Sequence, residues 1–232
     1  MIGSGPSLRA SPIGAGSDDV VRLLSQRQQS QLAVIATEVH LPPARIVYRE
    51  DSCAECVFIV ARGTLKAFRD LPSGKRRVLA FLFRDDLFGL AEGGHYLHTA
   101  QSISAVTLYR IPVHALTRML QADPELQFQF LCKVAHELRA SLRQTIIVGR
   151  RDAVGRVAMF LQLLQPAGDR ARRSRIEIPM SRSDAANYLG LTLEAVSRAT
   201  RTLERMGVVG FTGRHAAQIL DTSKFHKLVT GL

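Results

Sequence analysis

One long amphipathic helix constrains the fold of this chain more than any other feature of its sequence. Asp123 and Pro124 mark its start, because Asp caps helix N-termini and Pro suits the first turn. From there to about residue 148, residues recur at alternating spacings of three and four, which is the pattern of a heptad seam. The seam residues are Leu131, Val134, Leu138, Ser141, Thr145 and Val148.

This seam can pack against two partners, its own domain or a second copy of the chain. The length of the helix favours a two-stranded coiled coil, so we expect the six seam residues to form a homodimer interface. Phe128, Ala135 and Leu142 widen the apolar face. The small or polar Ser141 and Thr145 weaken the seam. We therefore expect the domain before the helix to help hold the dimer.

The residues before the long helix show the pattern of β structure. Short runs rich in Val, Ile and Phe predict strands at 45–48, 56–60, 64–68, 77–83 and 102–111. Pairs of Pro, Gly and Asp separate these runs and indicate turns. Many short strands at this spacing are typical of a sandwich or a barrel. A helix is expected before them, at about 19–37.

The chain thus divides into four expected segments. Residues 1–18, rich in Gly, Ser and Pro, form a flexible tail. A sensor-like β-barrel domain follows at 19–122, then the dimerisation helix at 123–149. A break in the helical pattern at 149–152 begins the last domain, 150–232.

Positive charge is in excess and is concentrated in that last domain. The net charge is +11 and the isoelectric point is near 10.4. From residue 150 onward, 14 Lys and Arg stand against 7 Asp and Glu, a net of +7, whereas the first 149 residues carry +4. Such an excess favours a polyanion, either nucleic acid or an anionic membrane. No apolar run approaches the ~20 residues of a membrane span, and no secretory signal is recognisable. We expect a cytoplasmic protein that binds nucleic acid and no membrane.

The last domain contains the pattern of a helix-turn-helix. Ser183 is expected to cap its first helix, and Ala186 is small where the second helix crosses. Gly190 stands where the turn needs a positive φ. Thr192 is expected to cap the second helix, and Val196 fills the space between the two. This spacing is typical of the two-helix unit that fits a major groove.

A β-hairpin is expected directly after this unit, with strands at 208–211 and 217–220. Leu203 and Met206 are expected to extend the buried face of the second helix. The hairpin forms a wing, so the domain is predicted to be a winged helix-turn-helix. An αα-hairpin inside an ordinary core is the alternative, but it leaves the exposed Arg198 and Arg201 unexplained.

Four side chains of the second helix are expected to reach base edges in the major groove. Arg198 can make paired hydrogen bonds to guanine, and Glu194 can accept one from a cytosine amino group. Leu193 can touch thymine methyl groups, and Ser197 can serve either base. The alternative for Glu194 is a charge stabilised by the helix dipole. Phosphate contacts, which position the protein without reading sequence, are expected from Arg182, Ser183, Thr192, Arg201, Arg205 and Arg214.

These motifs resemble the CRP/FNR superfamily over nearly all of the chain after about residue 20. The stretch 191–198 is similar to the recognition helix of FNR and FixK proteins, in which Glu-x-x-Ser-Arg reads TTGA. Glu194, Ser197 and Arg198 fill those positions. Residues 86–95 also resemble this branch, and rhizobial FixK proteins most of all. The resemblance implies an α+β fold with a jelly-roll barrel, a coiled-coil dimer helix and a winged helix-turn-helix. It also implies activation of genes for microaerobic respiration, nitrogen fixation and denitrification from a TTGA-N6-TCAA-like palindrome.

Two signal-binding features of that superfamily are missing. Members that bind cyclic AMP hold it with a Gly-Glu pair and a downstream Arg, but here Gly89 precedes Leu90 and the Arg position falls near His98 and Thr99. FNR itself holds an iron–sulfur cluster with N-terminal cysteines, whereas no cysteine precedes Cys53. We therefore expect no cofactor and DNA binding without an effector.

Other reactive residues do not form a convincing site. Cys53 and Cys56 make a C-x-x-C pair, but no second cysteine pair accompanies it, so we expect ordinary barrel residues. His95 and His98 could join a metal site, yet no metal is expected. No catalytic constellation is recognisable, and an enzyme is not expected.

The leading hypothesis is a homodimeric transcription activator that binds double-stranded DNA and offers a surface to RNA polymerase. A ligand- or redox-sensing regulator of the same superfamily, which would require a small molecule, is the first alternative. A nonspecific architectural DNA-binding protein is the second.

Overall fold

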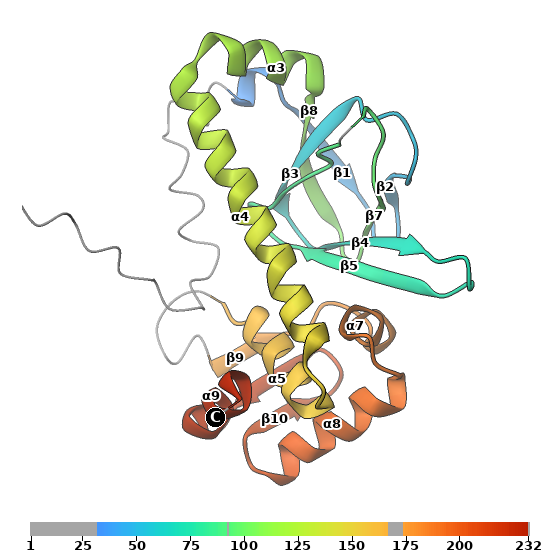
Figure 1. Ribbon diagram of the computed structural model, residues 1–232, viewed down its shortest axis with the longest axis vertical. Helices are drawn as coiled ribbons and strands as arrows, with labels where there is room; N and C mark the ends of the chain where they lie inside the picture. The colour runs from blue at the N-terminus through green and yellow to red at the C-terminus, as the bar shows by residue number, and fades with distance from the viewer. Residues whose placement is uncertain (1–31, 92, 167–173, 232) are drawn as a thin grey trace, which may run out of the picture.

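Two antiparallel four-stranded sheets form the N-terminal half of the computed structural model, which describes residues 32–91, 93–166 and 174–231 (Figure 1). One sheet has the order β1-β8-β3-β6 and the other β2-β7-β4-β5. Their buried faces meet in an apolar core in which Val60, Leu65 and Leu108 are fully enclosed. The strands are β1 (Thr37–Leu41), β2 (Ile46–Tyr48), β3 (Cys56–Arg62), β4 (Leu65–Asp70), β5 (Arg76–Leu82), β6 (Leu87–Phe88), β7 (Thr99–Ser102) and β8 (Val106–Pro112).

The strand expected at 102–111 is wrong as a single element. It is two strands, β7 and β8, which belong to different sheets. Between them the backbone N–H groups of Ile103 and Ser104 donate to the carbonyl of Thr64, at 2.8 and 3.3 Å. These hydrogen bonds fix the connection where the chain leaves the sheet that contains β7 and enters the sheet that contains β8.

Several elements near the ends of the barrel were not predicted. β1, β6 and α3 (Val113–Ala122) are present in addition to the expected strands. The helix expected at about 19–37 is described only at 32–35, and its predicted end is wrong because Thr37 opens β1, opposite Arg110 of β8. The rest of that helix and the expected tail lie outside the described residues.

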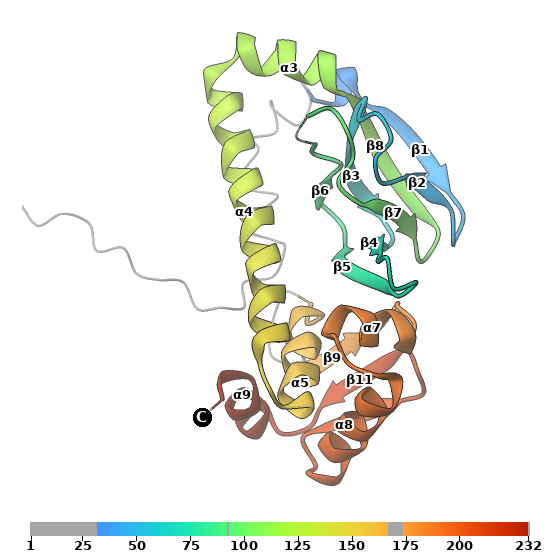
Figure 2. The same cartoon turned by 45° about the vertical axis from the view of Figure 1, so that its right-hand side comes forward.

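The long helix is present as α4 (Pro124–Gly149) and runs beside the barrel down to the C-terminal part (Figure 2). Its predicted start is confirmed, because the Asp123 carboxylate accepts the N–H of Leu126 at 3.0 Å. One side of α4 packs on the barrel, where Lys133 and Glu137 form an ion pair of 2.9 Å and Glu137 accepts the N–H of Leu87. No described helix is long and apolar enough to pass through a membrane.

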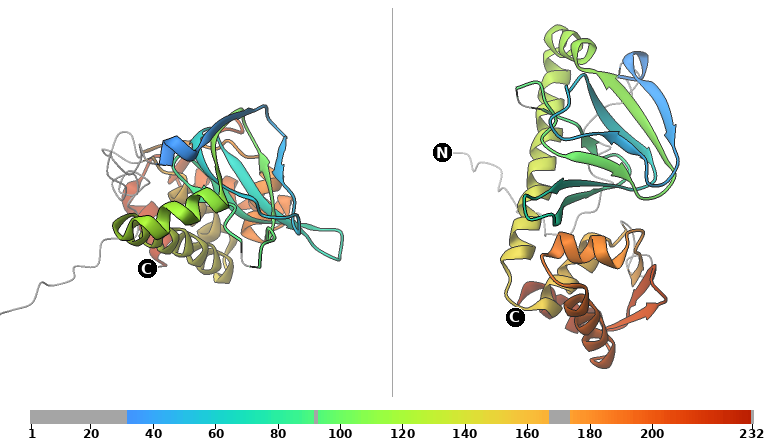
Figure 3. Two further views of the ribbon diagram at one scale, coloured as in Figure 1. Left: turned by 90° about the horizontal axis from the view of Figure 1, so that it is seen from above. Right: turned by 90° about the vertical axis from the view of Figure 1, so that its right-hand side faces the viewer.

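The C-terminal part lies below the barrel and combines helices with a small three-stranded sheet of order β10-β11-β9 (Figure 3). The predicted break after α4 is confirmed, since α5 begins at Ala153 with the Asp152 carboxylate as its cap. The terminal helix α9 was not predicted. The elements are α5 (Ala153–Leu163), β9 (Arg175–Glu177), α7 (Arg182–Leu189), α8 (Leu193–Arg205), β10 (Val209–Thr212), β11 (Ala216–Ile219) and α9 (Thr222–Thr230).

Candidate DNA-binding interface

Helices α7 and α8 form the two-helix unit that the sequence predicts, with one change at its start. The hydroxyl of Ser181 accepts the N–H of Asp184 at 3.0 Å, so Ser181 is the cap of α7. The prediction of Ser183 as the cap is wrong, because Ser183 already lies inside the first turn. A serine stands at both positions, but only Ser181 is followed three residues later by an acidic residue, Asp184, which is the signal that could have identified the cap.

The turn between the helices depends on Gly190. Its backbone is left-handed, at φ 64° and ψ 37°, and its N–H donates to the carbonyl of Ala186. A side chain is disfavoured in this region, whereas glycine enters it freely. The prediction of a positive φ at Gly190 is confirmed.

Helix α8 is capped by Thr192, as predicted, since the Thr192 hydroxyl accepts the N–H of Ala195 at 3.1 Å. Val196, Ala199 and Leu203 point into the core and leave the opposite face of the helix in solvent. Met206 was expected to extend the buried face, but it is 42% exposed. It is the C-cap residue of α8, directly before Gly207, where the chain leaves the helix with a positive φ.

The side chains expected to read bases lie together on the solvent side of α8. Leu193, Glu194 and Arg198 are exposed, and Ser197 is half-buried beside them. Hydrogen bonds from its own backbone N–H and from the Thr192 hydroxyl hold the pKa of Glu194 below its usual value, and the charge of Arg198 adds to this effect. Glu194 is therefore ionised at neutral pH and can act as an acceptor next to a guanidinium donor.

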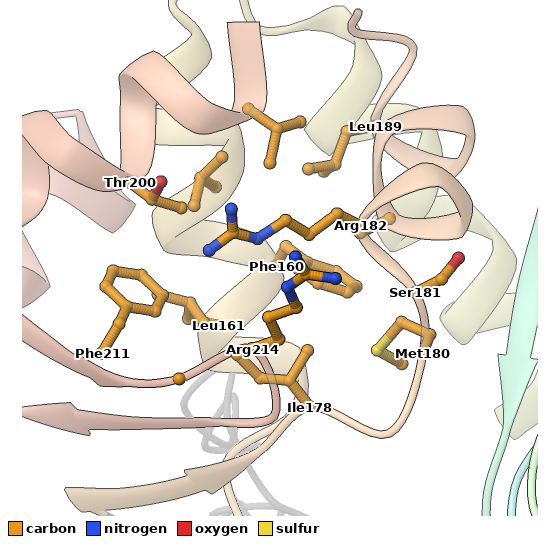
Figure 4. A pocket seen from close by; sticks show the side chains of 14 residues that line it. Phe160, Leu161, Ile178, Met180, Ser181, Arg182, Leu189, Thr200, Phe211 and Arg214 are labelled. Carbon is orange, nitrogen blue, oxygen red and sulfur yellow. The ribbon is translucent and has the colours of Figure 1, made fainter. Parts of the chain in front are cut away.

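The residues expected to contact phosphate surround this face. Arg182, Ser183, Thr192, Arg201, Arg205 and Arg214 are all exposed. Figure 4 shows the guanidinium groups of Arg182, from α7, and Arg214, from the turn after β10, pointing into one pocket near Phe160. Neither forms an ion pair with any carboxylate among the described residues. Two adjacent cations without a counter-ion suit an anionic phosphate.

The outer face of α4 carries a continuous apolar stripe. Five large side chains on it are 55–62% exposed in the single chain: Phe128, Leu131, Leu138, Leu142 and Ile146. Leu131 and Leu138 belong to the predicted seam, and Phe128 and Leu142 to the residues expected to widen it. Ile146 was not singled out. Its apolar type, four residues after Leu142, is the signal that could have identified it.

The other seam residues lie around this stripe. Ser141 and Thr145 are exposed. Val134 instead packs partly against the barrel, on the cluster around Ile111, and Val148 is half-buried. One side of α4 thus packs on its own barrel, and the described side chains on the other side are exposed to solvent.

The interior of the barrel is filled by aromatic rings. Tyr48 stacks on Tyr96 with ring centroids 3.8 Å apart, and Phe58 stacks on Phe88 at 5.3 Å. The Tyr48 hydroxyl lies 2.9 Å from Nε2 of His98. No group of three or more His, Cys, Asp or Glu side chains gathers as a metal site in the described part of the chain.

Gly89 and His98, which lie at the positions where members that bind cyclic AMP hold the nucleotide, border this aromatic cluster. A Cβ on Gly89 would stand 3.1 Å from the ring of Phe58, so no side chain fits there without a shift. Burial lowers the pKa of His98 below its usual value, so its ring is neutral at pH 7. Arg69, whose charge acts on His98, is ion-paired with Glu50. These residues offer no free positive charge for a cyclic phosphate.

Comparison with known proteins agrees with this geometry. The family model for the cyclic nucleotide-binding domain matches residues 38–123, and the one for the Crp-like helix-turn-helix domain matches residues 155–228. The transcriptional activatory protein AadR of Rhodopseudomonas palustris is 30% identical over 201 residues, which cover 84% of this chain and 82% of AadR. The chain belongs to the CRP/FNR family of transcription regulators.

Relatives of this CRP/FNR regulator include FixK proteins. The nitrogen fixation regulation protein FixK of Bradyrhizobium diazoefficiens is 30% identical over 199 residues, covering 84% of this chain and 82% of that one. The structure of FixK2 from Bradyrhizobium japonicum superposes with a TM-score of 0.77 at 31% identity, covering 84% and 97% of the two chains. These matches confirm the resemblance to the CRP/FNR superfamily with FixK-like relatives, and the predicted α+β fold with a jelly roll and a helix-turn-helix.

Proposed function

We propose that this regulator binds as a homodimer to a TTGA-N6-TCAA-like palindrome and activates transcription from it. The observation that carries this proposal is the solvent face of α8, where Glu194, Ser197 and Arg198 lie on one side of a capped, firmly packed helix. An arginine and an acceptor on a helix of this kind can read guanine and cytosine edges in the major groove. Leu193, exposed at the start of the helix, adds an apolar contact for a thymine methyl group.

The homodimer is supported by the apolar stripe on α4. Five large apolar side chains gathered on one helix face are unusual for a monomer surface and mark an interaction site. A second copy of α4 can cover the stripe by two-stranded packing. Two α8 helices related by the dimer axis would then enter successive major grooves about 34 Å apart.

The regulated genes and the polymerase contact rest on the relatives. FixK proteins are named for the regulation of nitrogen fixation, and AadR is named as an activator. We infer the same class of role here, in microaerobic, nitrogen-fixation or denitrification genes, with the barrel offering a surface to RNA polymerase. A regulator of promoters works where the DNA is, in the cytoplasm.

Selection of bound sites from a random DNA pool tests the proposed function. The untreated protein, with no small molecule added, is expected to enrich palindromes with TTGA and TCAA half-sites, the TTG and CAA triplets being most constrained. Competition by unrelated DNA at roughly 150 mM salt separates sequence-specific binding from phosphate binding, which fades as salt rises. Enrichment of no sequence under these conditions would reject the proposal and favour an architectural protein.

A ligand-dependent regulator is the second candidate, because the cyclic nucleotide-binding domain model matches residues 38–123. The aromatic cluster around Tyr48 and the neutral His98 argue against a cyclic nucleotide. We expect cyclic AMP to leave the melting temperature unchanged, whereas a true ligand at 100 times its Kd would stabilise the fold by about 2.7 kcal/mol. A rise in melting temperature together with ligand-dependent DNA binding would favour this second candidate.

A further inference from the structure

The barrel holds the first helix of the helix-turn-helix by a nearly enclosed ion pair. Nζ of Lys66, on β4, lies 2.6 Å from Oδ1 of Asp184, on α7, and the two side chains are only 13% and 14% exposed. The other carboxylate oxygen of Asp184 accepts the hydroxyl hydrogen of Ser181 at 2.8 Å. Both oxygens are thus satisfied, one by the barrel and one by the cap of α7.

Aromatic packing surrounds the same contact. Phe81 of β5 lies against Tyr188 of α7 with ring centroids 5.1 Å apart, and Phe160 of α5 lies 5.6 Å from Tyr188 and 5.9 Å from Phe81. Phe68 and Val78 of the barrel belong to the same buried cluster as the helix-turn-helix core. The barrel and the DNA-binding part therefore share one apolar core at this hairpin of β4 and β5.

One arginine is hydrogen-bonded to the turn between α7 and α8, and a second lies beside it. Arg156 of α5 donates to the carbonyl of Leu189 at 3.0 Å, and also to the carbonyl of Arg150 in the break after α4. Nη1 of Arg77, on β5, lies 2.8 Å from the point where a Cβ on Gly190 would stand. The turn that sets the angle of α8 is thus linked to the dimer helix on one side and to the barrel on the other.

We propose that Lys66 is a positioning residue for DNA recognition, which fixes the orientation of α8 relative to the dimer helix through Asp184. Apolar packing is non-directional, whereas an enclosed ion pair in which both carboxylate oxygens are bonded tolerates little displacement. Two half-sites must be met at a set separation, so a fixed orientation selects palindromes of one spacing. In a regulator that works without an effector, this contact keeps the binding-competent arrangement populated.

This inference rests on the proposed DNA binding and predicts a loss of spacing selectivity. Lys66→Met keeps the length of the side chain but removes its charge. If the competent orientation falls to about a tenth of the population, the apparent affinity falls about tenfold. We expect Lys66→Met to bind the N6 palindrome about tenfold more weakly, while palindromes with N5 and N7 spacers lose less. Binding titrations on the three duplexes measure the ratio.

Three further variants distinguish a positioning role of Lys66 from a nonspecific effect of removing a positive charge on DNA affinity. Lys75→Met makes the same change on the exposed turn of the same hairpin, where Lys75 has no ion-pair partner among the described residues, and should leave all three affinities unchanged. Asp184→Asn should reproduce Lys66→Met, and the double variant should cost no more than either single one. Lys66→Arg keeps the charge and should retain most of the spacing preference.

Hydrogen exchange supplies a readout that needs no DNA. The amides of α7 should exchange faster in Lys66→Met than in Lys75→Met, because the barrel no longer restrains that helix. Failure of the wild-type protein to bind any palindrome would reject the proposed function, and the exchange result would still decide whether the contact restrains α7. If Lys66→Met does not fold, Asp184→Asn and Lys66→Arg carry the test.

Two results would overturn the positioning role. One is an unchanged ratio between the three spacers in both Lys66→Met and Asp184→Asn. The other is tighter binding of the N6 palindrome by either variant, which would make the contact an inhibitory restraint.

Discussion

Replacing Arg198 by alanine is expected to remove discrimination at the guanine of each half-site. A bidentate arginine–guanine contact contributes about 1–3 kcal/mol of discrimination, so the two half-sites of a palindrome together lose about 2–6 kcal/mol. The reason is local, since Arg198 is exposed on α8 next to Glu194, whereas Val196, Ala199 and Leu203 are the residues that pack the helix into the core. Fluorescence anisotropy on the palindrome, and on duplexes with each other base at the guanine, measures the loss.

Arg205→Ala is the matched control for Arg198→Ala. Arg205 is also exposed on α8, but it lies in the last turn, where it donates to the Thr202 hydroxyl at 3.2 Å. We expect its removal to weaken all duplexes alike and to lower the slope of log affinity against log salt by about 2, because each of the two subunits loses one phosphate contact. If Arg198→Ala weakens specific and random duplexes equally, Arg198 contacts only phosphate and the proposed readout is wrong.

The sequence predicts the local features of the interface well, because local rules determine them. Thr192 as a cap, Gly190 in the left-handed region and Val196 in the core each follow from neighbours within a few residues. The cap of α7 shows a limit in how such rules were applied. Ser181, unlike Ser183, is followed three residues later by an acidic residue, Asp184, and the prediction of Ser183 overlooked this signal.

The helix α4 shows a second limit. A heptad pattern on a helix defines an apolar face, but it does not say which part of that face the protein's own barrel will cover. The barrel covers the side of Val134, and the exposed stripe runs through Phe128 and Ile146 instead. In the C-terminal half of α4 the predicted seam residues Ser141 and Thr145 therefore each precede a stripe residue, Leu142 or Ile146, by one position.

Contacts between distant segments were beyond prediction. Lys66 and Asp184 are 118 residues apart in the chain, and neither carries a motif that points to the other. The aromatic rings inside the barrel are a similar case, because alternation in each strand shows which residues point inward but not that Tyr48 will stack on Tyr96. These contacts depend on how the two sheets and the helices are placed together.

Introducing charge into the stripe of α4 is expected to dissociate the dimer. The change is Leu131→Glu combined with Leu138→Glu, at two positions that are exposed in the single chain and would be buried in the dimer. Burial of one leucine stabilises by about 1.5–3 kcal/mol, so four leucines in a dimer contribute up to about 6–12 kcal/mol. Facing glutamates also repel each other. Sedimentation velocity should show a monomer, and affinity for the palindrome should fall to that for a single half-site.

Leu97→Glu is the control for this effect. Leu97 lies in the loop before β7, on a different element from the stripe, and at 56% its exposure is similar to that of the stripe residues. It should leave both the dimer and the affinity for the palindrome intact. The monomeric double variant should still fold, because Leu131 and Leu138 are exposed in the single chain, but it should melt at a lower temperature because dimerisation no longer stabilises it. A double variant that stays dimeric would show that another surface holds the two chains together, and the two α8 helices would then need a different symmetry axis to meet the palindrome.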